Sequence, residues 1–515
     1  MECCCMVKKE SAGVTMGRKS FLIMGSNVLA AMIGFVALTT MTRYVGDAYG
    51  SLMWAMAFAA TFNAISDLGF SSANVKRISE GQDVNDCFST FIIVKMALTA
   101  VMMTATIGFF LVYIFVLGNQ IYTASIYTLL LFVLYWGLCN MSGVFTSLFK
   151  ARKEISKSES IHLIDPLLRA PVIVIFALQG ASATYLALAY VLGAMAMVLV
   201  GILLLRRSGI RFVRPTLFRN YLRFALPLSG IVFLSALLVN LDVLLLGFFW
   251  NATEVGYFAS SYKLLELVLT FGAAINTLLF PSISEWHALG DMERIRDISS
   301  EAQRFISMLA MPIAVFLFIF AYPVAGIVFG DGFVGAGGPL TVMSLMLYII
   351  LIMGVQSQVI IGCNRPDLTA KTQIVVLGMR VMLLIVFVPT SFFGIPMLEL
   401  KAAGAAMAGL VSWIAYAVIV EMFTRRIAGI SIYRGIGLHI IGGGITALAM
   451  VSLAQVLPMT GFLTMLFLAA VTMGLFLTMM FIVKELRRDD IRMIANALDP
   501  RKMLSYIREE IGERD

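Results

Sequence analysis

The chain has 515 residues and a net charge of +8; 60% of its residues are hydrophobic and 13% are charged. Soluble domains have about 45–50% apolar and about 25% charged residues. This composition, with a mean hydropathy of +0.92, therefore excludes an ordinary soluble domain and predicts an all-α polytopic membrane protein. The three histidines and six cysteines show no metal-ligand spacing, and the sequence has no phosphate-binding loop. We expect no enzyme, catalytic residue, metal site, cofactor or nucleic-acid partner.

Apolar runs of about 20 residues, the length of a membrane-spanning helix, recur along the whole chain. The connections between them are short, which leaves no large extramembrane domain for a glycosyltransferase or ligase site. Transport is therefore the leading class of function. The runs predict about fourteen helices, near 20–43, 50–70, 90–116, 124–148, 161–179, 182–205, 224–249, 254–281, 304–329, 338–362, 369–390, 402–424, 434–457 and 460–483.

The distribution of lysine and arginine predicts the orientation of these helices. Of the 38 basic residues, two lie in predicted outer loops and four within helices, which leaves 32 (38 − 2 − 4) in predicted inner segments. Cytoplasmic loops carry an excess of Lys and Arg. We therefore expect a multi-pass protein of the cytoplasmic (plasma) membrane with both termini inside and an even number of helices.

Three short matches, in the same order, indicate an internal repeat. They place Gly256 on Gly50 (256 − 50 = 206), residues 282–285 on 77–80 (285 − 80 = 205) and Arg380 on Arg169 (380 − 169 = 211). A repeat of six helices keeps its orientation, which predicts two six-helix lobes related by a parallel pseudo-twofold axis, with two C-terminal helices added. The predicted divisions are 1–215 and 216–427 for the lobes, 428–484 for helices 13 and 14, and 485–515 for a cytoplasmic tail.

Arginines within the spans are candidates for function, because a charged side chain in hydrocarbon is costly. Arg169 and Arg380 occupy matching positions of the two halves, and we expect a paired cationic site that faces an interior cavity. Their guanidinium groups suit phosphate oxygens. Asp165 lies four residues before Arg169 on the same helical face, so an intrahelical ion pair is the alternative. Arg380 has no acid at these spacings, and its counter-ion must come from another helix or from a ligand.

Other ionisable residues fall within predicted spans. Lys263 and Glu266 are three residues apart on one helical face, and Lys263 is a further candidate for substrate binding. Asp242 and Glu266 are candidates for coupling transport to a Na⁺ or H⁺ gradient. Asp242 could equally be the counter-ion of Lys263 or Arg380. Lys95 and Asp67 lie near inner helix ends, where snorkelling toward the headgroups is expected.

The first two predicted helices resemble those of a known superfamily. The first helix ends in TRYVGDAYGSLMWA, and the second carries ISDLGFSSANVKRIS, in which Asp67, Leu68 and Gly69 form a D-x-G element. With six plus six plus two helices, the chain resembles the MOP flippase superfamily and its Wzx-like polysaccharide or oligosaccharide flippase branch. The resemblance implies a flippase that moves a glycan on polyprenyl phosphate or pyrophosphate from the inner to the outer leaflet, through a cationic cavity with alternating access.

Two alternatives to this function remain open at this point. A Na⁺- or H⁺-coupled multidrug exporter of the same superfamily would use acidic cavity residues, for which Asp242, Asp165 and Glu266 are available. An accessory membrane scaffold of a glycan-assembly complex would require the intramembrane charges to be dispensable. The expected partners are the polyprenyl-linked glycan, membrane lipids and polysaccharide-assembly proteins.

Overall fold

The computed structural model describes residues 25–79, 81–117, 123–215, 238–457 and 461–486, and these are mainly helical. The first half contains the helix Gly25–Val45, α2 (Asp47–Asn63), the 3₁₀ turn η1 (Ala64–Ser66), α3 (Phe70–Ser79), α4 (Val84–Leu117), α5 (Thr123–Ala151), α6 (Ile155–Leu178) and α7 (Ala183–Arg206). The second half contains the helix Leu238–Phe249, α9 (Ala252–Ala288), α10 (Met292–Ile319), α11 (Ala321–Phe329), the 3₁₀ turn η2 (Asp331–Ala336), α12 (Gly337–Gly362), α13 (Pro366–Phe387), α14 (Lys401–Ala428), α15 (Ile436–Val456) and α16 (Phe462–Ile482). A short antiparallel hairpin, β1 (Ser391–Phe392) and β2 (Ile395–Pro396), joins α13 to α14.

The predicted all-α membrane fold is confirmed. Within the described residues, eleven helices are long and apolar enough to cross a membrane. The other three predicted ranges contain α2, α9 and the shorter helix Leu238–Phe249. Eleven such helices do not establish the predicted count of fourteen, which stays a prediction.

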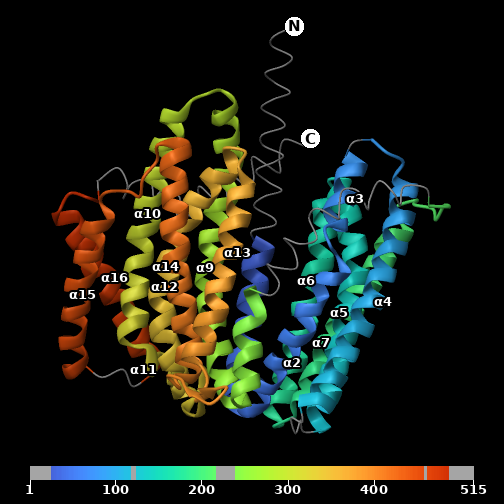
Figure 1. Cartoon of the computed structure of the whole chain (residues 1–515), viewed down its shortest axis with the longest axis horizontal. Helices are drawn as coiled ribbons and strands as arrows, with labels where there is room; N and C mark the ends of the chain where they lie inside the picture. Colours follow the sequence, from blue (N-terminus) through green and yellow to red (C-terminus); the bar gives the residue numbers. More distant parts are fainter. Residues whose placement is uncertain (1–24, 80, 118–122, 216–237, 458–460, 487–515) are drawn as a thin grey trace.

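The helices form two bundles, as Figure 1 shows. Helices α3 to α7 lie in one bundle, and α9 to α16 lie in the other, with α2 packed against both α5 and α9. The bundles meet at the end that carries α11 and the β-hairpin, and they diverge toward the end that carries α3 and the start of α10. We call these ends the closed end and the open end.

The predicted second helix is interrupted near the open end. Between α2 and α3, Leu68 and Gly69 have positive φ angles of 43° and 86°. These left-handed conformations cannot continue a right-handed helix, and glycine tolerates them best because it has no Cβ. The corresponding helix of the second half, α9, runs without interruption to Ala288. The repeat is therefore asymmetric at this point, which the sequence match between residues 77–80 and 282–285 does not reveal.

The last two helices attach to the second bundle partly through buried polar groups. His439 on α15 is fully buried, and its Nδ1 lies 2.6 Å from Oγ of Ser307 on α10. That hydroxyl also lies 2.6 Å from the Tyr348 hydroxyl on α12. Helix α16 packs against α10 and α15. These contacts give His439 a packing role, as expected for an isolated histidine.

The predicted divisions of the chain fall partly outside the described residues. After α7, the backbone N–H groups of Arg211 and Val213 donate hydrogen bonds to Asn85 Oδ1 and Ser89 Oγ, both at 2.9 Å, so this stretch follows the start of α4. Residues 216–237, with which the predicted second lobe begins, lie outside the described residues. Of the predicted tail, only Glu485 and Leu486 are described.

Replacing His439 tests the attachment of α15. His439→Leu removes one of the two partners of the Ser307 hydroxyl, which keeps Tyr348, and we expect the free energy of unfolding to fall by about 0.5–1.5 kcal/mol. Denaturant unfolding of the purified protein in detergent micelles measures this change. His162→Leu, at an exposed position of α6, is the matched control and should unfold like the wild type. Equal stability of the two variants would contradict the packing role of His439.

Candidate functional site

A cavity of about 220 Å³ lies where the two bundles meet. Its walls come from the helix Gly25–Val45, α2, α6, α7 and α9, so both halves of the chain contribute to it. Most lining side chains are small or apolar. The charged and aromatic hydroxyl groups that line it are Arg169, Lys263, Glu266, Tyr49 and Tyr190.

Arg169 reaches the cavity from α6 and is held there by three neighbours. Its Nη1 lies 3.1 Å from Asp165 Oδ2, and it donates a hydrogen bond of 3.4 Å to the Tyr135 hydroxyl. Its guanidinium carbon lies 4.4 Å from the centre of the Tyr190 ring, a cation–π contact. The i,i+4 ion pair expected as an alternative is present. The arginine nevertheless keeps 19% of its side chain exposed and remains part of the cavity wall.

Asp165 has acceptor capacity that Arg169 does not use. Its Oδ1 is buried without a hydrogen-bond partner among the described residues. Gly193 on α7 makes room for this oxygen, because a Cβ atom at Gly193 would lie 2.3 Å from it. Helix α6 also contains Pro166 and Pro171, each of which lacks the N–H that would bond the carbonyl four residues earlier. The arginine thus lies in a stretch of helix whose backbone ladder is weakened.

Lys263 and Glu266 form the second ion pair of the cavity. Lys263 Nζ lies 2.6 Å from Glu266 Oε2, and both side chains are about half exposed, at 44% and 52%. This confirms the prediction that the two residues share one face of α9. Because the pair is exposed, it is worth only about 0–1 kcal/mol. Either partner can leave the other at small cost when a competing ion arrives.

Arg380 does not join Arg169 in this cavity, contrary to the sequence-based expectation. It is buried on α13, where its Nε donates a 3.0 Å hydrogen bond to Asp242 Oδ1 and its Nη2 pairs with Asp242 Oδ2. Asp242, on the helix Leu238–Phe249, is 2% exposed. The bidentate pair, one of the two pairings that the sequence left open for Asp242, supplies the counter-ion that α13 lacks at helical spacing from Arg380. It explains why this arginine is tolerated away from the cavity. It also engages both oxygens of Asp242, a predicted coupling residue.

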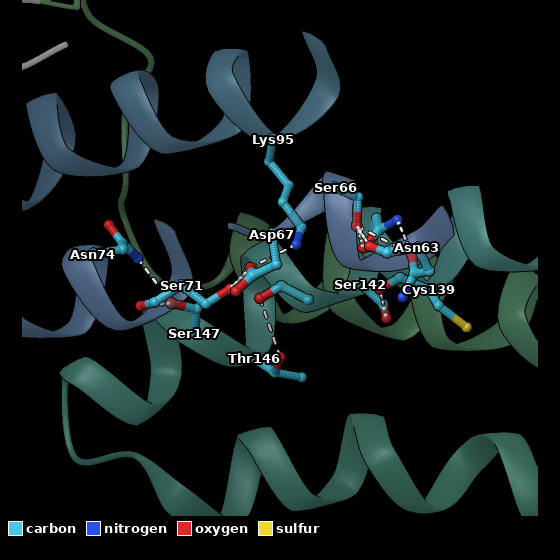
Figure 2. A network of polar contacts seen from close by, with 12 residues as sticks. Asn63, Ser66, Asp67, Ser71, Asn74, Lys95, Cys139, Ser142, Thr146 and Ser147 are labelled. Carbon is cyan, nitrogen blue, oxygen red and sulfur yellow. Dashed lines mark hydrogen bonds and ion pairs between the residues drawn. The ribbon is translucent and has the colours of Figure 1, made fainter. Parts of the chain in front are cut away.

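The expectation that Lys95 snorkels toward the headgroups is wrong, because its side chain is buried and pairs with Asp67. Lys95 on α4 is 4% exposed, and its Nζ lies 2.8 Å from Asp67 Oδ1. Figure 2 shows the lysine extending from α4 to the interruption between η1 and α3. Ser71 donates to the same carboxylate oxygen. This pair ties the interrupted helix to α4 and is not among the residues that line the cavity.

A polar network continues from this pair toward α5 (Figure 2). Asn140 on α5 donates a 2.8 Å hydrogen bond to Asn63 Oδ1, and Ser66 donates one of 2.8 Å to Asn140 Oδ1. Asn74 on α3 donates to Ser147 at 3.0 Å. These bonds satisfy polar groups that face the interior where the α2–α3 segment departs from helical geometry.

Sequence reasoning missed the tyrosines that complete the site. Tyr49, Tyr135 and Tyr190 come from three helices. They are uncharged, so nothing in the sequence distinguishes them from tyrosines that only pack in the core. Tyr49 is fully buried, and Tyr190 is 7% exposed. A weak signal was available, since Tyr49 directly precedes Gly50, one of the repeat matches. The helix Gly25–Val45 was predicted as a span but not as a wall of the site.

Comparisons with known proteins agree with this architecture. Residues 16–287 match a family model described as polysaccharide biosynthesis protein. The chain is similar to the probable low-salt glycan biosynthesis flippase Agl15 of Haloferax volcanii, with 22% identity over 407 residues, which are 77% of this chain and 81% of that protein.

Solved structures with the same fold are also found. The lipid II flippase MurJ in an inward closed conformation matches with a TM-score of 0.70 and 12% identity, over 88% of this chain and 98% of that one. An inward-facing multidrug resistance MATE family transporter of the MOP superfamily matches with a TM-score of 0.64 and 15% identity, over 78% and 96%. An outward-facing structure of this type matches less closely, with a TM-score of 0.55 and 14% identity, over 81% and 95%.

The buried pair between Arg380 and Asp242 predicts a characteristic double-mutant pattern. Arg380→Met leaves Asp242 buried and unpaired, and we expect the free energy of unfolding to fall by about 3–5 kcal/mol. The double variant Arg380→Met with Asp242→Leu removes both charges and should recover most of this loss. Unfolding in detergent micelles gives both values. If the double variant were as unstable as Arg380→Met, the two residues would do more than neutralise each other's charge, and this interpretation would be wrong.

Proposed function

Because the chain belongs to the polysaccharide biosynthesis protein family, we propose that it flips a lipid-linked oligosaccharide or polysaccharide precursor across the cytoplasmic membrane by alternating access. The substrate is a glycan on polyprenyl phosphate or pyrophosphate, and the protein changes no covalent bond. The similarity to a glycan biosynthesis flippase supports this substrate class. The observation that carries the proposal is a cavity between the lobes that places two basic side chains beside an apolar groove.

The open end is the cytoplasmic end in this proposal. The connection after α5 carries Arg152 and Lys153, and the first turns of α10 at the same end carry Arg294 and Arg296, as the positive-inside rule requires. Both termini then lie in the cytoplasm. The bundles diverge toward this side, and the closer match to an inward-facing than to an outward-facing transporter supports the same assignment. We therefore assign this structure to the state that takes up substrate.

The phosphate or pyrophosphate group binds at Arg169 and Lys263 in this proposal. The two side chains come from different lobes and line one cavity. The volume of about 220 Å³ is below the roughly 300–1,000 Å³ of pockets for drug-sized ligands. The cavity is thus suited to a head group, and the sugars would extend beyond it. Tyr190, stacked on Arg169, holds the guanidinium in place for a phosphate oxygen.

An apolar groove next to the cavity offers a path for the polyprenyl chain. The groove measures about 300 Å³ and lies between the helix Gly25–Val45 and α9. Ala31, Phe35, Leu267 and Thr270 line both the groove and the cavity, so the two are continuous. A lipid tail can therefore remain in apolar surroundings while its phosphate reaches the basic residues. Soluble organic cations would not need such a groove.

Binding of phosphate requires the basic residues to exchange partners. Each base that lines the cavity has a carboxylate partner within the described residues: Asp165 for Arg169 and Glu266 for Lys263. The exposed pair on α9 separates at small cost, whereas Arg169 is held by several contacts. We therefore assign Lys263 the role of the mobile ligand that leaves Glu266 for the phosphate. A cavity that is neutralised when empty also releases its cargo more easily than an uncompensated cationic one.

Coupling to an ion gradient stays within the proposal. Glu266 faces the cavity and exchanges its partner during substrate binding, so it is the better candidate for a Na⁺ or H⁺ site. Asp242 is engaged by Arg380. The glycan, the surrounding lipids and proteins of polysaccharide assembly are the proposed partners. A multidrug exporter is the second candidate, and the half-exposed carboxylate of Glu266 is the observation that favours it.

Flipping of a lipid-linked oligosaccharide in proteoliposomes tests the proposed function. Lys263→Gln should reduce the initial rate at subsaturating substrate by roughly ten- to 150-fold, because a hydrogen bond to a charged group contributes about 1.5–3 kcal/mol. The double variant Arg169→Gln with Asp165→Asn, which leaves no unpaired acid, should be impaired similarly. Lys371→Gln is the matched control, since its side chain is 71% exposed and outside the cavity.

Two outcomes would contradict the proposal. Flipping unchanged by Lys263→Gln would remove the cavity lysine from substrate binding. Absence of flipping by the wild type, with efflux of organic cations from cells that express it, would favour the exporter. Expression and thermal unfolding of each variant show whether a loss of flipping reflects misfolding.

A further inference from the structure

The two lobes touch at the closed end through equivalent residues of the repeat. The sequence match places Gly256 on Gly50, and in the structure these two glycines lie against each other: a Cβ atom at Gly256 would be 3.6 Å from Gly50 Cα. The same offset relates Asp47 to Thr253 (253 − 47 = 206), and the Thr253 hydroxyl donates a 2.7 Å hydrogen bond to Asp47 Oδ1. Contacts between equivalent residues are expected where a twofold axis crosses an interface. The pseudo-twofold axis therefore passes close to this contact.

Glycine at position 50 is required for the approach of the two helices. A Cβ atom there would lie 1.7 Å from the carbonyl oxygen of Ala252 and 3.0 Å from the backbone nitrogen of Gly256. These are backbone atoms, so they cannot yield as the end of a side chain would. Small residues allow helices in membranes to pack with their backbones in contact. Even alanine at position 50 would force α2 and α9 apart.

The contact lies beside the cavity wall. Tyr49 and Met53 of α2 line the cavity, and Gly50 lies between them in the sequence. The Tyr49 ring packs edge-on against Phe333 of η2, with the ring centres 6.1 Å apart. Phe333 also covers Gly256, where a Cβ atom would lie 3.3 Å from its ring. Tyr49 thus belongs both to the cavity wall and to the packing around the contact at the closed end.

A polar clasp at the rim joins the same two lobes. Arg43, near the end of the helix Gly25–Val45, donates to the carbonyl oxygens of Ile327 and Val328 in the last turn of α11. The C-terminal end of a helix attracts a cation. Gly330 lets the arginine pass, since a Cβ atom there would lie 3.0 Å from Arg43 Cγ. Both Arg43 and Asp47 are exposed, so these cross-lobe bonds can exchange for water when the lobes separate.

We propose that the contact of Gly50 with Ala252 and Gly256 is the outer seal of the cavity and the point where the lobes part to release substrate. The inference rests on the proposed alternating-access function. Asp47, Thr253 and the Arg43 clasp hold the seal closed while the cavity faces the cytoplasm. The seal packs backbone against backbone at the axis, so a rocking motion of the lobes opens it without disrupting either bundle.

Reversible crosslinking across the seal tests this proposal. In a protein whose six native cysteines are replaced by alanine, Asp47→Cys and Thr253→Cys are joined by a short thiol crosslinker in proteoliposomes. We expect flipping to fall in proportion to the crosslinked fraction and to recover after reduction. Thr128→Cys with Thr184→Cys is the matched control, because these hydroxyls are 3.1 Å apart within one lobe. Full flipping by the crosslinked 47–253 pair would overturn the proposal.

A second experiment does not depend on flipping. Ala30→Cys places a thiol in the cavity wall, and its labelling by a membrane-impermeant reagent from the outer side reports opening of the seal. Gly50→Ala should increase this labelling. Gly256→Ala should do so less, because the Phe333 ring can move. Gly108→Ala is the control, since a Cβ atom there meets nothing within 4 Å.

The two experiments separate the seal from the substrate. If Gly50→Ala did not change labelling at position 30 from the outer side, the proposal that Gly50 forms the seal would be wrong. Increased outer labelling in a protein that flips no lipid-linked glycan would support the seal and count against the proposed substrate.

Discussion

The cost of an unpaired charge in hydrocarbon governs how this chain is assembled. The four basic residues predicted within the spans each have a carboxylate partner: Asp67 for Lys95, Asp165 for Arg169, Glu266 for Lys263 and Asp242 for Arg380. Two of these pairs are buried away from the cavity and fix helices within one bundle. The other two place their bases, Arg169 and Lys263, in the cavity wall, where an incoming anion can compete for the base. Pairing therefore divides the intramembrane charges into those that support the fold and those available to a ligand.

Sequence alone predicted the two local pairs, offered Asp242 as the counter-ion of either Lys263 or Arg380, and did not pair Lys95 with Asp67. The reason is physical. Asp165 with Arg169 and Lys263 with Glu266 lie one helical turn apart, so helix geometry alone brings them together. Arg380 and Asp242 are 138 residues apart, and Lys95 and Asp67 are 28 apart, so only tertiary packing joins them. Apolar runs likewise predicted the helices well, because the bilayer sets their length. The interruption at Leu68 and Gly69 was not predicted, because it depends on two positive φ angles that the hydropathy pattern does not reveal.

The internal repeat predicted which residues of the two halves are equivalent, but not what each of them does. Arg169 and Arg380 match in sequence, yet one lines the cavity and the other is neutralised inside its lobe. Gly50 and Gly256 also match, and they meet at the axis. A parallel repeat brings equivalent helices together along its axis, where side-chain size decides how closely they approach. Away from the axis, equivalent residues do not contact each other and can have different surroundings in the two lobes. This is why Arg169 can line the cavity while Arg380 is buried against Asp242.

Binding of substrate phosphate in the proposed cycle depends on the exchange of partners by Lys263, and the affinity for substrate reports on this exchange. The measurement is the dissociation constant of a polyprenyl-pyrophosphate oligosaccharide for the protein in lipid nanodiscs. Glu266→Gln removes the competitor for the lysine, and we predict tighter binding, by up to about fivefold for an exposed pair. Glu301→Gln, an exposed position on α10, should bind like the wild type. Unchanged or weaker binding by Glu266→Gln would contradict this exchange of partners.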